Sequence, residues 1–217
     1  MKSKFDLNYV LAELESSDNF MLCNLLKDLG SLSILDVRDK EGMSLLHHAV
    51  LKGVDGKTQL LLDFAKTYQN HSAHDIREWI NSQTHQEKWS ALHYASFSGN
   101  LDAVYTLIEN GADIKSLNAN GLNMLHVAAQ GDQAPPLYLF KMLGLNINSV
   151  DNRGSTPIHW ACYSQSETAL AYLLAWKPDL TIQDKEGFTA LHLAVKSVEP
   201  LFSIRPVRAL LIKGANP

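Results

Sequence analysis

A short segment that recurs along the chain constrains its fold more than any other feature. The segment ends in His-x-Ala, and successive copies are 46, 33, 33 and 33 residues apart. Its histidines are His47, His93, His126, His159 and His192. One unit of this length cannot bury its apolar face alone. The chain is therefore predicted to stack several similar units, one of them lengthened by 13 residues.

Each copy carries the signals of a short inner helix. The residue three positions before each histidine is Ser, Asn or Thr, whose side chain can accept a hydrogen bond from the first N–H groups of a helix. Pro157 then occupies the first helical position, where its missing N–H is tolerated. Gly53, Gly99 and Gly131 stand where the left-handed turn that ends the inner helix is expected. The predicted N-cap residues are Ser44, Ser90, Asn123, Thr156 and Thr189.

A second, outer helix and a loop complete each copy. In the copy that includes residues 100–110, one helical face carries the apolar residues Leu101, Val104, Leu107 and Ile108. Further along, turn-forming Asn or Asp recurs three residues before Gly, at Asn118, Asp151 and Asp184. Each copy is thus predicted to be a helix pair with a protruding hairpin.

These five copies resemble the Thr-Pro-Leu-His-x-Ala signature of ankyrin repeats, from about Asp36 to the end of the chain. The resemblance implies an all-α ankyrin-repeat solenoid of stacked helix-turn-helix units with protruding β-hairpin loops. Residues 37–217 are expected to form five repeats. Residues 1–36 lack the signature, and helices over 5–16 and 18–29 are expected to form an N-terminal helical cap.

Two irregularities interrupt the repeat. The extra residues fall near 63–88, where residues 73–80 are predicted to form an amphipathic helix with Ile76, Trp79 and Ile80 on one side. In the loop that follows, His85 and Lys88 replace the usual Asp and Gly, so that hairpin is expected to be distorted. At the other end, residues 214–217 match the first half of a hairpin, and the repeat array is expected to be truncated there.

Composition excludes several classes of function. Nineteen Lys and Arg residues against 23 Asp and Glu give a net charge of −4 without a basic block, so nucleic acid is not an expected partner. The longest apolar run, residues 169–176, is far shorter than the roughly 20 residues of a membrane-spanning helix, so direct membrane insertion is not expected. Cys23 and Cys162 have neither disulfide nor metal spacing, which indicates a cytoplasmic protein.

No catalytic residue, metal or cofactor is expected in this chain. The repeated histidines are predicted to hold the N-cap side chain and nearby loop backbone rather than a ligand. His71, His74 and Asp75, with His85 nearby, are predicted to be polar surface of the insertion, since zinc needs four well-placed ligands. Lys57 and Thr58 lack the first glycine of a phosphate-binding loop.

A binding surface for protein is the remaining candidate. Solenoids usually bind partners on their concave face, which the loop tips and the exposed side of the inner helices build. Trp89 is the expected main anchor, and the alternative is that it packs near Trp79 and serves stability. The expected partner is a short extended peptide segment of a cytosolic protein. The candidate residues are Trp89, Phe97, Asn120, Leu122, Gln130, Arg153, Tyr163 and Phe188.

A narrower resemblance covers residues 109–217. The segments 121–133, 152–163 and 205–215 resemble the ankyrin region that precedes the catalytic domain of Asp-His-His-Cys (DHHC-type) palmitoyltransferases. The resemblance implies that this chain is the substrate-recruiting domain of a membrane-bound protein S-palmitoyltransferase, on the cytosolic face of an internal membrane. The acyl-transferring, zinc-binding domain would then follow Pro217. The alternative is a free-standing cytosolic ankyrin adaptor or scaffold with no enzyme attached, and no feature favours a self-contained enzyme.

Overall fold

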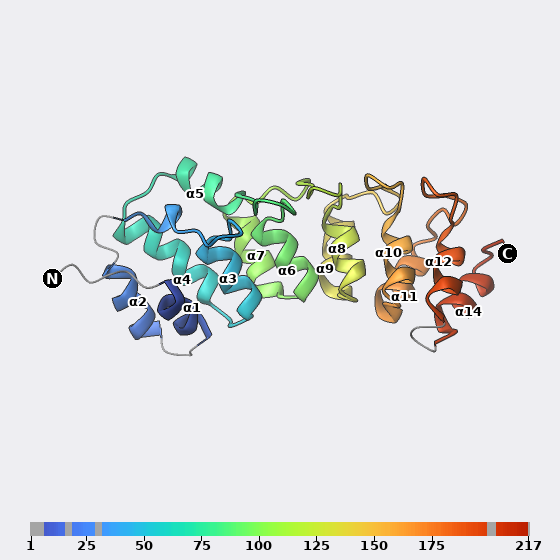
Figure 1. Cartoon of the computed structure of the whole chain (residues 1–217), viewed down its shortest axis with the longest axis horizontal. Coiled ribbons are helices and arrows are strands. Elements are labelled where there is room, and N and C mark those ends of the chain that lie inside the picture. The colour runs from blue at the N-terminus through green and yellow to red at the C-terminus, as the bar shows by residue number, and fades with distance from the viewer. Residues whose placement is uncertain (1–6, 16–18, 29–31, 199–202, 217) are drawn as a thin grey trace. The chain divides into compact units, whose positions relative to one another are not determined.

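The computed structural model describes residues 7–15, 19–28, 32–198 and 203–216. It divides into two compact units, Met1–Ala95 with Asp102–Asp113 and Ser96–Leu101 with Ile114–Pro217, which are described separately. Throughout the described ranges the regular elements are helices (Figure 1). This confirms the predicted all-α class.

The first unit begins with two helices that lie inside the ranges predicted for the cap. α1 packs against α2 and also against α3, which in turn packs against α4. Leu14, Leu22, Leu46 and Leu61 are fully buried in this core. The helices of the unit are α1 (Leu7–Glu15), α2 (Asn19–Lys27), η1 (Ile34–Asp36), α3 (Leu45–Lys52), α4 (Lys57–Asp63), the π-helical η2 (Phe64–Tyr68) and α5 (Ala73–Ile80), and both units contribute residues to α6 (Ala91–Ser98) and α7 (Leu101–Glu109).

The helix predicted in the insertion is present as α5. Its residues Ile76, Trp79 and Ile80 are buried, as their spacing predicts, and the helix packs against η1 and η2. The Ser72 side chain accepts from the N–H of Asp75, and the Asp75 carboxylate accepts from the N–H of Ser72. This capping box fixes where the helix begins.

The distortion predicted for the hairpin after α5 is also present. The N–H of Thr84 donates to the carbonyl of Trp89 at 3.0 Å, whereas the regular loop before α3 closes one residue earlier, from Asp39 to Met43, at 3.0 Å. Lys88 takes the left-handed conformation, with φ of 54°, that glycine adopts in the other loops. The sequence alignment of this loop was wrong in one respect, because Thr84 and not His85 takes the role of the aspartate and accepts from the N–H of Trp89.

The second unit is built from two rows of helices (Figure 1). The inner helices α8, α10 and α12 pack side by side, and the outer helices α9, α11 and α14 each pack against an inner partner. Phe140, Leu173 and Leu210 occupy equivalent positions of the three outer helices and are fully buried. The bounds are α8 (Met124–Gln130), α9 (Ala134–Met142), α10 (Pro157–Tyr163), α11 (Glu167–Ala175), α12 (Ala190–Lys196) and α14 (Arg205–Ile212).

Helix ends follow the predicted signals with one exception. Gly53 and Gly99 are left-handed as predicted, with φ of 67° and 77°. Gly131 is not, because its φ is −81° and the left-handed residue is Asp132 at 56°. The Asp132 carboxylate accepts from the N–H of Ala169 at 2.7 Å and thereby caps the next outer helix.

The protruding loops are closed mainly by turns. Isolated antiparallel bridges join Arg38 to Ser44 and Gln83 to Ser90, and the described residues form no extended strand. The described part of the chain also has no helix long and apolar enough to cross a membrane.

Candidate functional site

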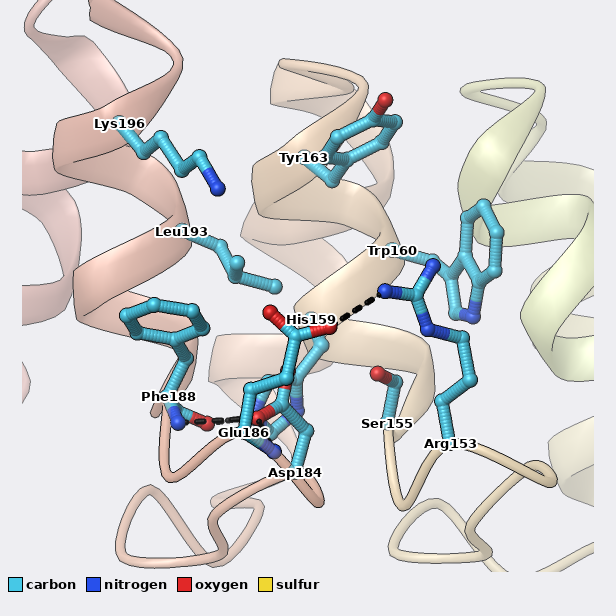
Figure 2. Close-up of a pocket in the computed structure, with 10 residues that line it drawn as sticks. All are labelled: Arg153, Ser155, His159, Trp160, Tyr163, Asp184, Glu186, Phe188, Leu193 and Lys196. Carbon is cyan, nitrogen blue, oxygen red and sulfur yellow. Dashed lines mark hydrogen bonds and ion pairs between the residues drawn. The ribbon is translucent and has the colours of Figure 1, made fainter.

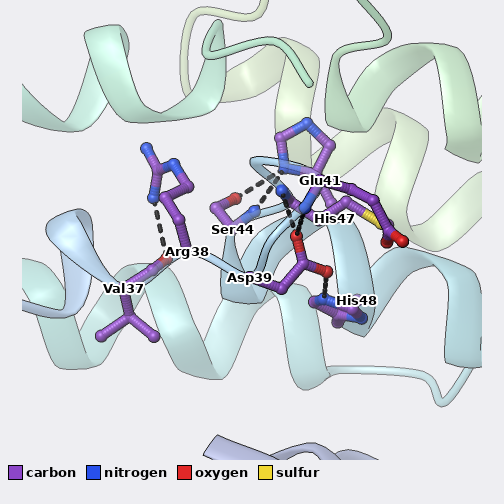
Figure 3. A network of polar contacts seen from close by, with 8 residues as sticks. Val37, Arg38, Asp39, Glu41, Ser44, His47 and His48 are labelled. Carbon is purple, nitrogen blue, oxygen red and sulfur yellow. Dashed lines mark hydrogen bonds and ion pairs between the residues drawn. The ribbon is translucent and has the colours of Figure 1, made fainter. Parts of the chain in front are cut away.

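The repeated histidines tie each inner helix to the following loop. Nδ1 of His47 accepts from the N–H of Ser44 at 3.0 Å, and Nε2 lies 3.1 Å from the carbonyl oxygen of Trp89 (Figure 3). Because a carbonyl oxygen only accepts, Nε2 carries the proton of a neutral ring. Burial lowers the pKa of His47 to about 4, against the opposing effect of the Trp89 carbonyl. His126 and His159 contact the carbonyls of the next loops at 3.1 and 3.2 Å in the same way, which confirms the predicted structural role.

The loop aspartates position the side chains of the candidate site. Oδ1 of Asp151 accepts from the N–H groups of Arg153 and Ser155, both at 2.8 Å, and Oδ2 accepts from Nε1 of Trp160 at 2.9 Å. Asp184 holds the following loop through the N–H groups of Glu186 and Phe188, both at 2.9 Å. Two neighbouring loops are thus fixed in the same shape.

A groove of about 330 Å³ lies between these loops and the inner helices α10 and α12 (Figure 2). Aromatic and aliphatic side chains form one part of its lining, and charged groups from the loop tips form the other. The lining residues are Arg153, Ser155, His159, Trp160, Tyr163, Asp184, Glu186, Phe188, Leu193 and Lys196.

The aromatic part of the groove is ordered by ring contacts. The rings of Trp160 and Tyr163 meet edge to face with centroids 6.0 Å apart, and Tyr163 is 60% exposed. Nζ of Lys196 lies 5.3 Å from the centre of the Phe188 ring. Exposed aromatic rings held in a concave site are the side chains that most often anchor a protein partner.

The charged part of the groove contains both signs. Arg153 and Glu186 form an ion pair at 2.7 Å, and their side chains are 69% and 54% exposed. An ion pair this exposed contributes at most about 1 kcal/mol, so both groups can exchange each other for a ligand at small cost. The groove is suited to a partner that presents an apolar side chain next to polar or charged groups.

Three of the predicted binding residues, Arg153, Tyr163 and Phe188, come together in this groove. Sequence reasoning missed Trp160 and Leu193, which also line it. These two residues directly follow repeated histidines and are 33 residues apart, so the repeat register contained the signal that would have found them.

The other predicted residues of the second unit lie elsewhere. Leu122 is only 2% exposed and is not available to a partner, so its placement on an exposed surface was wrong. Its N–H is bonded to Asn118, which turns it inward. Phe97 and Asn120 are exposed and Gln130 is half-buried, and the groove lining includes none of the three.

Trp89 belongs to the first unit and is half-buried. Its ring lies 4.9 Å from the ring of Tyr94 and 6.0 Å from that of His93. Its carbonyl and N–H hold His47 and Thr84. These contacts favour the alternative role in stability, with Tyr94 rather than Trp79 as the ring neighbour, and its role as an anchor stays a prediction.

Metal binding finds no arrangement to support it in the described residues. No group of three or more His, Cys, Asp or Glu side chains there is placed to hold an ion. Burial raises the pKa of the Cys162 thiol, which disfavours the reactive thiolate.

Known proteins share the repeat over much of this chain. Palmitoyltransferase AKR1 of Lachancea kluyveri is 32% identical over 117 residues, which cover 52% of this chain and 16% of that protein. Palmitoyltransferase ZDHHC13 of Homo sapiens is 28% identical over 164 residues, 74% of this chain and 24% of that protein. The Transient receptor potential cation channel subfamily A member 1 homolog of Caenorhabditis elegans is 36% identical over 202 residues, 88% of this chain and 16% of that protein.

The predicted resemblance to palmitoyltransferases is confirmed by two of these relatives. The chain spans only 16% to 24% of the length of the three proteins. A family model of ankyrin repeats matches residues 12–118, 68–151 and 125–217, which together cover most of the sequence. The chain belongs to the ankyrin-repeat family.

Proposed function

We propose that this chain is a protein-interaction module whose groove in the second unit binds a short extended peptide segment of a cytosolic protein. The observation that carries the proposal is the convergence of Trp160, Tyr163 and Phe188 beside the exposed Arg153–Glu186 pair. Ankyrin repeats imply protein–protein interaction, and the groove gives that role a defined place.

The repeat explains why the ligand is extended. Trp160 and Leu193 occupy the same position in successive copies, as do Ser155 and Phe188. A row of equivalent positions matches a strand-like peptide, whose side chains recur along one line, better than it matches a compact small molecule. Backbone groups of such a peptide remain free to bond the loop tips.

Selection from a random peptide library on the purified chain tests this proposal. A selected peptide is expected to lose roughly tenfold or more in affinity with Tyr163→Ser, because truncating an exposed aromatic anchor removes most of its contact area. Tyr172→Ser is the matched control, since Tyr172 is 43% exposed on the outer helix α11. Equal losses in both variants, or none with Tyr163→Ser, would refute the assignment.

The finer proposal is that the module recruits substrates for a DHHC-type protein S-palmitoyltransferase on the cytosolic face of an internal membrane. The two relatives named palmitoyltransferases support it. It predicts that the gene encodes membrane-spanning segments and an Asp-His-His-Cys domain after Pro217. Sequencing the transcript past that codon is the direct test, and a reading frame without these segments would exclude it.

A second candidate is an ankyrin adaptor or scaffold with no acyltransferase attached. The Caenorhabditis elegans channel homologue favours it, because that protein matches 88% of this chain at 36% identity and is not named as an acyltransferase. Further repeats or a stop directly after Pro217 would support this candidate.

A further inference from the structure

The outer helices of the second unit expose a cluster of aromatic side chains. Tyr138 of α9 and Tyr172 of α11 are 50% and 43% exposed. Their rings lie 6.4 and 6.1 Å from the ring of Trp176, which follows α11. Met142, one turn after Tyr138, is 61% exposed. Tyrosine and tryptophan rings have an apolar body and a polar edge, and they gather at the headgroup level of membranes.

The same helices are cationic, although the whole chain has a net charge of −4. Residues 134–144, 167–177 and 205–213 contain five Lys or Arg side chains and one carboxylate, that of Glu167. This carboxylate is paired with Arg205 at 2.8 Å. Nζ of Lys141 lies 5.8 Å from the centre of the Trp176 ring, so positive charge and aromatic surface are adjacent.

α14 extends the same pattern. Arg208 and Ile212 follow Tyr138 and Met142 by 70 residues, the spacing that also separates the glycines that end the two outer helices. They therefore occupy equivalent outward positions, and Ile212 is 71% exposed. All three outer helices thus combine large apolar or aromatic groups with Lys or Arg at or near their ends.

We propose that this outer face, the exposed side chains of α9, α11 and α14, binds the surface of an anionic lipid membrane. Each Lys or Arg near such a surface is attracted by its negative potential, and the aromatic rings can enter the headgroup layer. The contact is peripheral and needs no spanning segment. Because the groove lies on the inner helices α10 and α12 and their loops, the same unit can hold a peptide while it rests on the membrane.

Vesicle flotation with the 217-residue chain tests this inference. Vesicles of phosphatidylcholine with about 30% phosphatidylserine are expected to bind the chain, and binding is expected to fall as salt rises from about 0.1 to 0.5 M. Lys141→Gln with Lys177→Gln is expected to weaken binding roughly thirtyfold, at about fivefold for each charge removed. Trp176→Phe is expected to abolish the blue shift of tryptophan fluorescence that accompanies binding, since the ring enters a less polar layer.

The matched control is Lys115→Gln with Lys185→Gln, which removes two exposed charges from the loops of the same unit. This control is expected to leave flotation within about twofold of the unchanged chain, because its charges lie off the outer face. Equal weakening by both pairs, or equal binding to pure phosphatidylcholine, would overturn the proposal. Absence of flotation would also overturn it and would leave the face to a protein partner. No peptide enters the assay, so its outcome is independent of the groove.

Discussion

Buried neutral histidines hold the loops of both units at the residue scale. His47 in the first unit and His126 and His159 in the second each donate from Nε2 to a loop carbonyl and accept at Nδ1 from the backbone N–H of the N-cap residue. Burial lowers the pKa of all three, to about 4 for His47 and His126. A second proton on such a ring would displace the N–H bond to Nδ1, so protonation opposes folding.

Stability is accordingly expected to fall as the pH falls from about 7 to about 5. The unfolded rings titrate near 6.5 and the folded rings lower, so between these values the unfolded chain binds more protons and acid favours it. The loss is on the order of 2 kcal/mol per ring once the pH nears the folded pKa. Urea unfolding at several pH values measures it, and His126→Gln is expected to reduce the slope. A free energy of unfolding independent of pH over this window would contradict the account.

At the element scale, local signals predicted the helices better than they predicted where each helix ends. The α5 helix was predictable because its apolar spacing and its Ser72 cap are local. The left-handed residue after α8 was not, because Asp132 bonds Ala169, 37 residues away. Gly131 is needed for a different reason, since a Cβ there would lie 2.1 Å from the carbonyl oxygen of Phe97. Glycine marked a close approach of two backbones, which the single-repeat pattern does not distinguish from a turn.

Gly131→Ala is therefore expected to destabilise the chain by about 1–3 kcal/mol, since the added methyl group meets backbone that cannot move aside. The higher helix propensity of alanine would act in the opposite direction, by up to about 1 kcal/mol. Denaturant unfolding decides between the two. Ser164→Ala is the control, because Ser164 ends α10 at the equivalent position with φ of −85° and already carries a Cβ. Its effect is expected within about 0.5 kcal/mol, and a neutral Gly131→Ala would show that the close approach is not limiting.

For the whole molecule, the repeat predicted where a binding surface would form but not every side chain in it. Arg153, Tyr163 and Phe188 followed from the template and line the groove. Leu122 occupies the same template position as Phe188, yet it is buried. Burial at one template position depends on the side chain and on its neighbours in the adjacent copy, which the template leaves out.

The helix α14 is expected to be the least protected part of the second unit in the 217-residue chain. It packs against α11 and α12, and Leu211 and Ile212 remain 45% and 71% exposed. Stability in repeat proteins comes from neighbouring copies, so a helix covered on one side opens more often. Amide hydrogen exchange is expected to be faster there than in α8 and α10. Equal protection of the three helices would contradict this view.

The central claim is that an extended peptide binds in the groove of the second unit. The most direct test compares amide hydrogen exchange of the chain with and without a selected peptide at saturation. Slower exchange is expected in residues 153–163 and 184–196, which contain the groove, and no change is expected in α9 and α11. Protection confined to the outer helices, or no protection in the groove segments, would contradict the claim.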